Sequence, residues 1–338
     1  MALQLISMKP ATSSVAFYLR YGAVLFIGVT IGWFLHAKPA PSPKATILRE
    51  PEGKYLFINP LIGFNPGDKN EFEEYTHLEE ILNDHIATLK RQGKIQSASV
   101  YFRNMENGRW TGVNENELYS PASLYKVALI IAVLRKSEDE PEILAERIVY
   151  RGSKTMDVPD APPMVIGTSY SIRDLLERLI ILSDNDAKDL LRDKVGSDAV
   201  SAVFKDLQLT EPSLEETGDT MSARAYSRFF RALYNATYLS RASSEYALGL
   251  LSKVDFKSGI RNGLPAEARE LPIAHKFGYR VFPEPRDSVT EELHDCGVVY
   301  MPELPYFICI MTKGSKQTDL MDAIQTLSRA VYMEATQQ

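Results

Sequence analysis

Apolar and polar residues follow one another along the chain with changing periods, and these periods predict most of its elements. From Asn70 to about residue 92, apolar residues recur every three or four positions, which predicts an amphipathic helix. Two short runs follow at 98–102 and 109–113, separated by the turn residues Asn107 and Gly108. This arrangement predicts a β-hairpin.

The rest of the chain has first helical and then strand patterns. We expect helices over 120–136, across most of 172–262 and over 319–333, a strand over 272–279, and a second hairpin that joins 297–301 to 306–311. Such an order predicts an α+β fold, in which N- and C-terminal helices flank an antiparallel sheet and an all-α lobe is inserted between its strands. The α/β lobe would comprise 70–120 and 271–338, and the mostly helical lobe 121–270.

The N-terminal region contains a long apolar run. Residues 16–35 carry a single charge, Arg20, so the run is just long enough to span a bilayer, and we expect a transmembrane helix at 16–36. Lys9 and Arg20 lie on its N-terminal side, so the positive-inside rule keeps residues 1–15 in the cytoplasm. The remainder of the chain is then expected outside the cytoplasm, anchored by one pass through the lipid bilayer.

A cleaved signal peptide is the alternative interpretation, because Ala37 and Ala40 follow the apolar run. Cleavage requires a small residue three positions before the bond, and Leu35 and Lys38 are not small, so a retained anchor is favoured. Residues 37–69 contain six prolines and three glycines, which indicates a linker.

Composition then narrows the function classes. The 338 residues include 38 Lys and Arg against 44 Asp and Glu, so the formal net charge is −6 and no overall positive field attracts nucleic acid. Two cysteines are too few for a cysteine-rich zinc site, and no two histidines have the spacing of a metal site. We expect no metal, no cofactor and a monomer. Cys296 and Cys309 fall on or beside the second hairpin, where a disulfide and two buried thiols are both compatible with the sequence.

The only S-x-x-K of the chain, Ser123 to Lys126, stands at the start of a strongly apolar helix. A spacing of three places the hydroxyl and the amine on one helical face, about a turn apart. The lysine can then accept the serine's proton, while the helix N-terminus favours the negative charge that develops. The alternative is that Ser123 only caps the helix and Lys126 extends into solvent.

Two further motifs suit the same chemistry. In Ser183-Asp184-Asn185, at a junction between helical segments, the serine can relay a proton to a leaving nitrogen and the asparagine can hold a substrate carbonyl. The same tripeptide is an ordinary helix cap. In the strand, Lys276 adds positive charge and Gly278 lets a substrate approach the strand edge, unless that lysine is simply solvated.

Taken in this order, the motifs resemble the serine β-lactamase and penicillin-binding protein superfamily, most closely the class A β-lactamases. The resemblance covers about Asn70 to the C-terminus. GIRNGLP at 259–265 resembles the helix-ending segment that precedes the lysine strand in that family. EPSL followed by GDTMS, within 211–222, resembles a shortened omega loop.

The resemblance implies a two-lobed catalytic domain over 70–338, with the active site at the junction of the lobes. Ser123 would be the acylated nucleophile, Lys126 its proton partner and Ser183 a proton shuttle. The remaining roles would fall to Asn185 on the substrate amide, Lys276 near the substrate carboxylate, and the backbone N–H groups of Ser123 and Tyr279 as the oxyanion hole beside Gly278.

The sequence also departs from the family pattern. Phe277 stands where the family usually has a Ser or Thr hydroxyl, so contact with a β-lactam carboxylate is weakened, although Arg280 could replace it. Glu211 matches the omega-loop glutamate that positions the hydrolytic water, but Glu215 replaces the usual asparagine. Glu211 is therefore either a general base or an exposed carboxylate. A literal K-S-G begins at Lys257 and is not expected in the site.

These features predict a serine hydrolase of the class A β-lactamase type, which opens β-lactam rings through an acyl-Ser123 intermediate. The first alternative is a penicillin-binding D-Ala-D-Ala peptidase that acts on peptidoglycan peptides. It applies if Glu211 cannot deliver water to the acyl carbon. The second alternative is a non-catalytic wall-binding module with the same fold.

Overall fold

The computed structural model describes residues 46–49, 55–65, 76–152, 162–212, 218, 220–283, 289–302 and 304–337. The chain divides into two compact units, Met1–Lys44 and Ala45–Gln338, and every described residue belongs to the second. The transmembrane helix expected at 16–36 and the cytoplasmic segment at 1–15 lie outside the described residues. Within the ranges given above, no helix is both long enough and apolar enough to cross a membrane.

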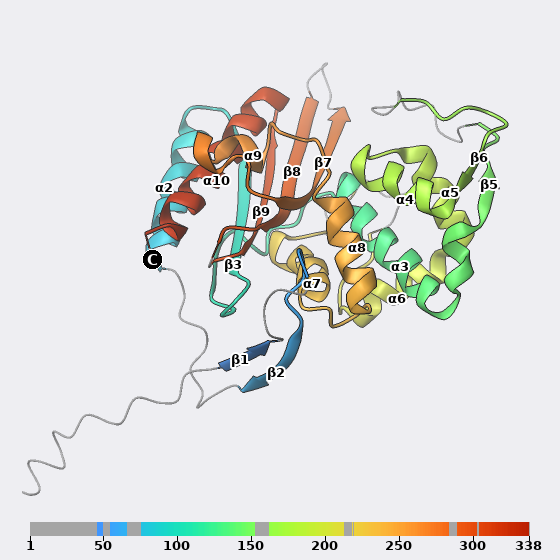
Figure 1. Cartoon of the computed structure of the whole chain (residues 1–338). Helices are drawn as coiled ribbons and strands as arrows, with labels where there is room; N and C mark the ends of the chain where they lie inside the picture. The colour runs from blue at the N-terminus through green and yellow to red at the C-terminus, as the bar shows by residue number, and fades with distance from the viewer. Residues whose placement is uncertain are drawn as a thin grey trace, which may run out of the picture. The chain divides into compact units, whose positions relative to one another are not determined.

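A five-stranded antiparallel sheet forms the centre of the described unit, in the order β4-β3-β9-β8-β7 (Figure 1). The strands are β3 Ser97–Asn104, β4 Trp110–Val113, β7 Ile273–Pro283, β8 Val289–Val299 and β9 Tyr306–Gly314. Strands from both ends of the chain therefore pair, with Val100 of β3 opposite Ile310 of β9.

Helices α2 (Thr76–Arg91) and α10 (Gln317–Ala335) pack against each other and against the sheet, and the short α9 (Ile260–Gly263) packs on α10 (Figure 1). The helical period found in the sequence accounts for this packing, because it places one apolar stripe on α2. Leu78, Leu82 and Ile86 from this stripe are buried among strand residues.

The inserted lobe is mostly helical, as predicted. It contains α3 Lys126–Asp139, α4 Ile172–Ile181, α5 Asn185–Val195, α6 Ser197–Asp206, α7 Ala223–Tyr234 and α8 Arg241–Leu251. It also contains the small antiparallel pair β5 Arg147–Val149 and β6 Ser169–Ser171, and the 3-10 turns η1 Ala122–Tyr125 and η2 Pro141–Ala145; a third, η3, spans Ala266–Ala268. Because α7 and α8 contact sheet strands, the lobes share a core. The predicted α+β architecture of this unit is confirmed.

The second hairpin is much longer than the sequence pattern predicts. β8 begins at Val289, eight residues before the predicted start at Gly297. The added residues include Glu292, His294 and Asp295, which are polar and yet buried. Alternation of polar and apolar side chains is the sequence signal of a half-buried strand, so a strand with charged residues inside the fold lacks this signal.

The linker predicted at 37–69 needs correction. Its described residues include the strands β1 (Thr46–Arg49) and β2 (Leu61–Asn65), which pair antiparallel. Between them, the backbone N–H groups of Leu56, Phe57 and Ile58 all donate to the Glu245 carboxylate on α8, at 2.8–3.2 Å. The described part of this segment is a docked arm, because a carboxylate far along the chain accepts from its backbone N–H groups.

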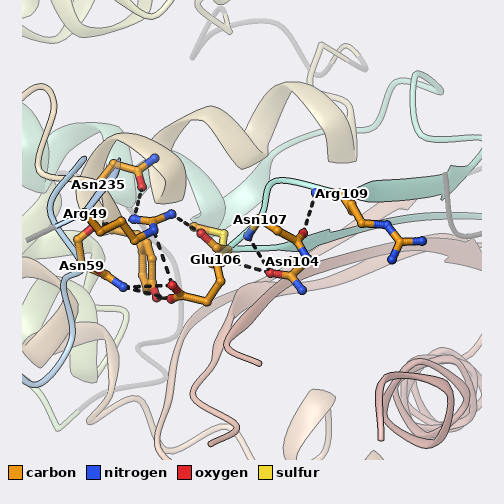
Figure 2. A network of polar contacts seen from close by, with 9 residues as sticks. Arg49, Asn59, Asn104, Glu106, Asn107, Arg109 and Asn235 are labelled. Atoms are coloured by element: carbon orange, nitrogen blue, oxygen red, sulfur yellow. Dashed lines mark hydrogen bonds and ion pairs between the residues drawn. The ribbon is translucent and has the colours of Figure 1, made fainter. Parts of the chain in front are cut away.

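Figure 2 shows a second attachment of this arm. The Arg49 guanidinium donates to the Asn235 side chain at 3.1 Å and to the Met105 carbonyl, and it lies 3.4 Å from Glu106. Asn59 donates to both Glu106 oxygens at 3.0 and 3.1 Å. The arm is thus tied to the turn between β3 and β4 and to the end of α7.

Cys296 on β8 and Cys309 on β9 face each other in register and form a disulfide. Both residues are fully buried. Of the two states that the sequence allows, the structure contains the disulfide.

Candidate active site

The S-x-x-K motif lies where η1 passes into α3. Ser123 belongs to η1, and Lys126 is the first residue of α3 and is almost completely buried. Its Nζ donates to Ser123 Oγ at 3.1 Å. Ala122 just before the serine has φ 45°, a left-handed conformation that costs a non-glycine residue about 1–3 kcal/mol. Surrounding contacts must therefore hold this turn.

Ser183 lies in the turn between α4 and α5, and its neighbour Asp184 fixes that turn. The Asp184 carboxylate caps α5 by accepting from the backbone N–H groups of Asp186 and Ala187, at 2.8 and 3.2 Å. Its other oxygen accepts from Arg178 Nε at 2.6 Å. Ser183 itself has φ 56°. The tripeptide is thus a helix cap, as the alternative interpretation proposed, and it also orients a buried serine towards the lysines.

The two lysines meet at this serine. Lys126 Nζ donates to Ser183 Oγ at 3.1 Å and to Asn185 Oδ1 at 2.8 Å. Lys276 Nζ, from β7, donates to the same Ser183 Oγ at 3.1 Å. The hydroxyls of Ser123 and Ser183, both amines and the Asn185 amide form one network, which three segments distant in sequence supply.

Gly278 allows β7 to approach Ser123 closely. A Cβ added there would lie 3.0 Å from the Pro121 carbonyl oxygen and 3.2 Å from the Ser123 nitrogen. Because β7 is the edge strand of the sheet on this side, its backbone at Gly278 faces η1 directly. Tyr279 follows on the strand; its hydroxyl donates to Glu291 at 3.0 Å, away from the network. Any role of Tyr279 in the site therefore rests on its backbone N–H.

An aromatic pair lies beside Lys276. The Phe277 ring stacks on Phe256 with centroids 4.3 Å apart and an interplanar angle of 18°. Lys276 Nζ lies 4.2 Å from the Phe277 centroid. Arg280 Nη1 donates to Ser120 Oγ at 3.4 Å, so this guanidinium contacts the segment before the nucleophile. The K-S-G at Lys257 lies outside the site, as expected, with its lysine 3.5 Å from Asp255.

Glu211 is exposed, at the start of the connection between α6 and α7. Its carboxylate is close enough to act on Tyr125, two residues after the nucleophile. Burial raises the pKa of the Tyr125 hydroxyl to about 12, and the negative charge of Glu211 adds to this shift. The role of Glu211 as a base stays a prediction.

Sequence reasoning missed the buried polar residues behind the turn that precedes Ser123. Glu292 and His294 contact the backbone of Ser120, and Asp295 pairs with His275 at 2.7 Å. All four side chains of this group from β7 and β8 are fully buried: His275, Glu292, His294 and Asp295. Charged residue types normally indicate exposed positions, so no sequence signal marks them as interior.

Comparison with known proteins matches the chain to a protein family. The model of the Beta-lactamase enzyme family matches residues 78–335, most of the chain. A β-lactamase from Streptomyces lavendulae is 28% identical over 238 residues, which are 65% of this chain and 74% of that protein. A β-lactamase from Streptomyces fradiae is 29% identical over 178 residues, 47% of this chain and 58% of its own length.

Solved structures show the same fold. The structure of PBP-A superposes with a TM-score of 0.67 and 21% identity, and covers 80% of this chain and 99% of its own. A β-lactamase from Chitinophaga pinensis gives a TM-score of 0.64 at 20% identity, over 76% of this chain and 98% of its own. The chain belongs to the Beta-lactamase enzyme family and is a serine hydrolase of the serine β-lactamase and penicillin-binding protein superfamily.

Proposed function

We propose that the chain opens β-lactam rings by a class A-type mechanism through an acyl-Ser123 intermediate. Ser123 Oγ attacks the lactam carbonyl carbon and its proton passes to Lys126. The carbon–nitrogen bond of the ring then breaks, and the nitrogen receives a proton relayed through Ser183. Water finally cleaves the Ser123 ester, which releases the opened acid and restores the serine hydroxyl.

The observation that carries this proposal is the network in which Lys126 joins Ser123 to Ser183. Two 3.1 Å contacts give a continuous path from the nucleophile to the second serine. Lys126 and Lys276 both approach Ser183 Oγ, and two positive charges that share one acceptor repel each other. An amine in its neutral form accepts the proton from Ser123.

Negative charge on the carbonyl oxygen would be stabilised by backbone N–H groups. Ser123 stands in the first turn of a helical segment, where N–H groups lack partners within the helix. The close approach of Gly278 places the β7 backbone beside the Ser123 nitrogen, so the N–H of Tyr279 can serve as the second donor. The Asn185 amide, held by Lys126, is available to the substrate amide.

The rate of the last step separates two candidate functions. Rapid hydrolysis of the acyl-enzyme needs a base that activates water, and Glu211 is the candidate. Its exposure favours a second possibility, a penicillin-binding peptidase that acts on D-Ala-D-Ala peptides and forms long-lived adducts with β-lactams. PBP-A, a protein of this fold, has been solved in mutant form as an acyl-enzyme complex with penicillin G.

The test is intact-mass spectrometry of the full chain mixed with benzylpenicillin and followed over time. We expect one adduct with the mass of the drug, absent from Ser123→Ala and retained in Ser315→Ala, which removes an exposed hydroxyl far along the chain. Decay within seconds would support a β-lactamase, and persistence for hours a peptidase. If the wild-type chain shows no adduct and does not hydrolyse the drug, β-lactam chemistry is contradicted. The wall-binding module would then be the remaining candidate.

We further propose that residues 16–36 anchor the chain in the membrane with its catalytic domain outside the cytoplasm. The twenty-residue apolar run and the basic residues before it support this orientation. The Cys296–Cys309 disulfide supports it independently, because disulfides persist mainly in oxidising compartments.

A further inference from the structure

The backbone that leads into the nucleophile is held by side chains from β7 and β8. The Ser120 N–H donates to Glu292 Oε2 at 3.0 Å, and the Ser120 carbonyl lies 2.9 Å from His294 Nε2. Arg280 completes the set through its 3.4 Å contact with the Ser120 hydroxyl. Every polar group of Ser120 therefore has a partner on these two strands.

The hydrogen bonds of His294 fix the tautomer of its ring. The backbone N–H of Thr312 donates to His294 Nδ1 at 3.3 Å, so Nδ1 carries the lone pair. The ring proton then lies on Nε2, which donates to the Ser120 carbonyl. Tyr119 packs edge-on against the imidazole with centroids 5.4 Å apart. His294 thus presents an oriented N–H donor to the Ser120 carbonyl.

Burial of the Glu292 carboxylate costs free energy. It is fully buried, and its charge is balanced by Lys313, whose Nζ lies 2.8 Å from Oε1. Lys313 stands opposite Glu292 on β9, and a buried carboxylate is tolerated only with such partners. An apolar side chain would fill this interior more easily. What the carboxylate adds is the bond to the Ser120 N–H.

The constraint on Ser120 reaches the nucleophile through two stiff residues. Pro121 has φ fixed by its ring, at −66°, and Ala122 is held at φ 45°. Directly across the sheet, His294 pairs with Gly278, which packs on the Ser123 nitrogen. A displacement of Ser120 would therefore move both Ser123 Oγ and its N–H.

We propose that Glu292 and His294 are positioning residues that hold the 120–122 turn in register, so that Ser123 Oγ stays within reach of Lys126 and its N–H stays aimed at the substrate carbonyl. The proposal rests on Ser123 being the nucleophile, as in the function proposed above. Neither side chain contacts the reacting atoms. Their removal should slow acylation and leave substrate capture little changed.

Paired variants of the full chain test this proposal. Glu292→Met and His294→Phe keep the bulk and remove the bonds to Ser120, whereas Glu292→Gln keeps an acceptor and His294→Gln a donor. We expect the maximal acylation rate constant with benzylpenicillin to fall about a hundredfold in the first pair, as for a misplacement near 1 Å. The half-saturating concentration should stay near the wild-type value, and the glutamine variants should recover most of the rate.

Ser328→Ala is the matched control. It removes a buried hydrogen bond to the Ile260 carbonyl without touching Ser120, Glu292 or His294, and its acylation rate should stay near wild type. Thermal unfolding shows whether each variant is folded, and if Glu292→Met is not, the comparison of His294→Phe with His294→Gln decides. If folded Glu292→Met and His294→Phe react at the wild-type rate, the proposal is overturned. An equal loss of rate in Ser328→Ala would also overturn it.

A small fluorophosphonate separates this proposal from the proposed function. The Ser123 hydroxyl displaces fluoride from phosphorus and releases HF, so labelling reports nucleophile placement without a β-lactam. If the wild-type chain takes this label but no benzylpenicillin, the proposed function fails, and the same variants are judged by their labelling rates. If it takes neither, Ser123 is not a reactive nucleophile and both proposals are overturned.

Discussion

Lys276 is the residue whose surroundings differ most from what the sequence family implies. Its amine contacts Ser183, and the ring beside it belongs to Phe277, which stacks on Phe256. An aromatic face attracts the ammonium but offers no hydrogen-bond donor to a carboxylate. If Lys276 lies near a substrate carboxylate as proposed, Phe277 gives that carboxylate no hydrogen bond from its side chain.

Replacing this ring should improve penicillin binding. We expect Phe277→Thr to lower KM for benzylpenicillin about tenfold, because one hydrogen bond to a charged group contributes about 1.5–3 kcal/mol. Steady-state or burst kinetics measure KM. Phe256→Leu is the control, since it breaks the same aromatic stack without adding a hydroxyl. An equal fall of KM in both variants would show that loosening the stack, and not the hydroxyl, is responsible.

Buried Glu292 should also make stability depend on pH. Burial raises the pKa of its carboxyl, but its contacts with His294 and Lys313 outweigh burial and hold the pKa below the usual 4.5. The folded chain therefore binds this proton less readily than the unfolded chain. The resulting stabilisation is complete above the unfolded-state pKa and is lost as the pH falls through the lower folded-state pKa.

Denaturant unfolding between pH 7 and pH 3 measures this contribution. We expect the free energy of unfolding to fall less steeply below pH 4.5 in Glu292→Gln than in the wild-type chain. Glu270→Gln, which alters an exposed carboxylate, should follow the wild-type curve. If the free energy of unfolding falls equally steeply with pH in all three chains, Glu292 does not contribute to the loss of stability in acid.

At the scale of elements, the sequence periods predicted the helices and strands that bury only one face. α2 and α10 were predicted because their apolar residues form a stripe, and β3 and β4 because a turn pair separates two apolar runs. β8 was predicted only at its apolar end. Its polar half is a strand because Lys313 and the backbone of Ser120 satisfy the side chains inside the fold.

The docked arm gives a prediction at this scale. Glu245→Ala removes the acceptor of three backbone N–H groups in residues 56–58, and leaving such groups unpaired costs about 1–3 kcal/mol. We expect Tm to fall by roughly 3–10 °C and proteolysis to become faster between residues 50 and 62. Differential scanning calorimetry and limited proteolysis measure the two effects.

Glu177→Ala, at an exposed position of α4, is the matched control and should change neither quantity. If Glu245→Ala also leaves Tm and the cleavage pattern unchanged, the arm is not held by this carboxylate.

At the scale of the whole molecule, the proposed membrane anchor and the disulfide both bear on the compartment of the protein. In living cells, we expect the chain to sediment with membranes, to be digested by protease added outside the cytoplasmic membrane, and to contain the Cys296–Cys309 bond. Ile27→Lys should release it from the membrane, since a charge at the centre of a spanning helix costs about 2.5–3.5 kcal/mol, whereas Ile27→Leu should not. A protease-protected, fully reduced wild-type chain would contradict the proposed orientation.

The amino-acid sequence alone determined the fold class, the order of most elements and the three motifs of the candidate site. These properties are local, because side-chain period and short spacings are written in neighbouring residues. Only the tertiary structure decided that Lys126 and Lys276 share Ser183, that the arm before residue 66 is docked, and that Glu292 and His294 lie inside the fold. Each of these features depends on partners far away in the chain. The sequence around a charged residue does not reveal the distant partner that allows it to be buried.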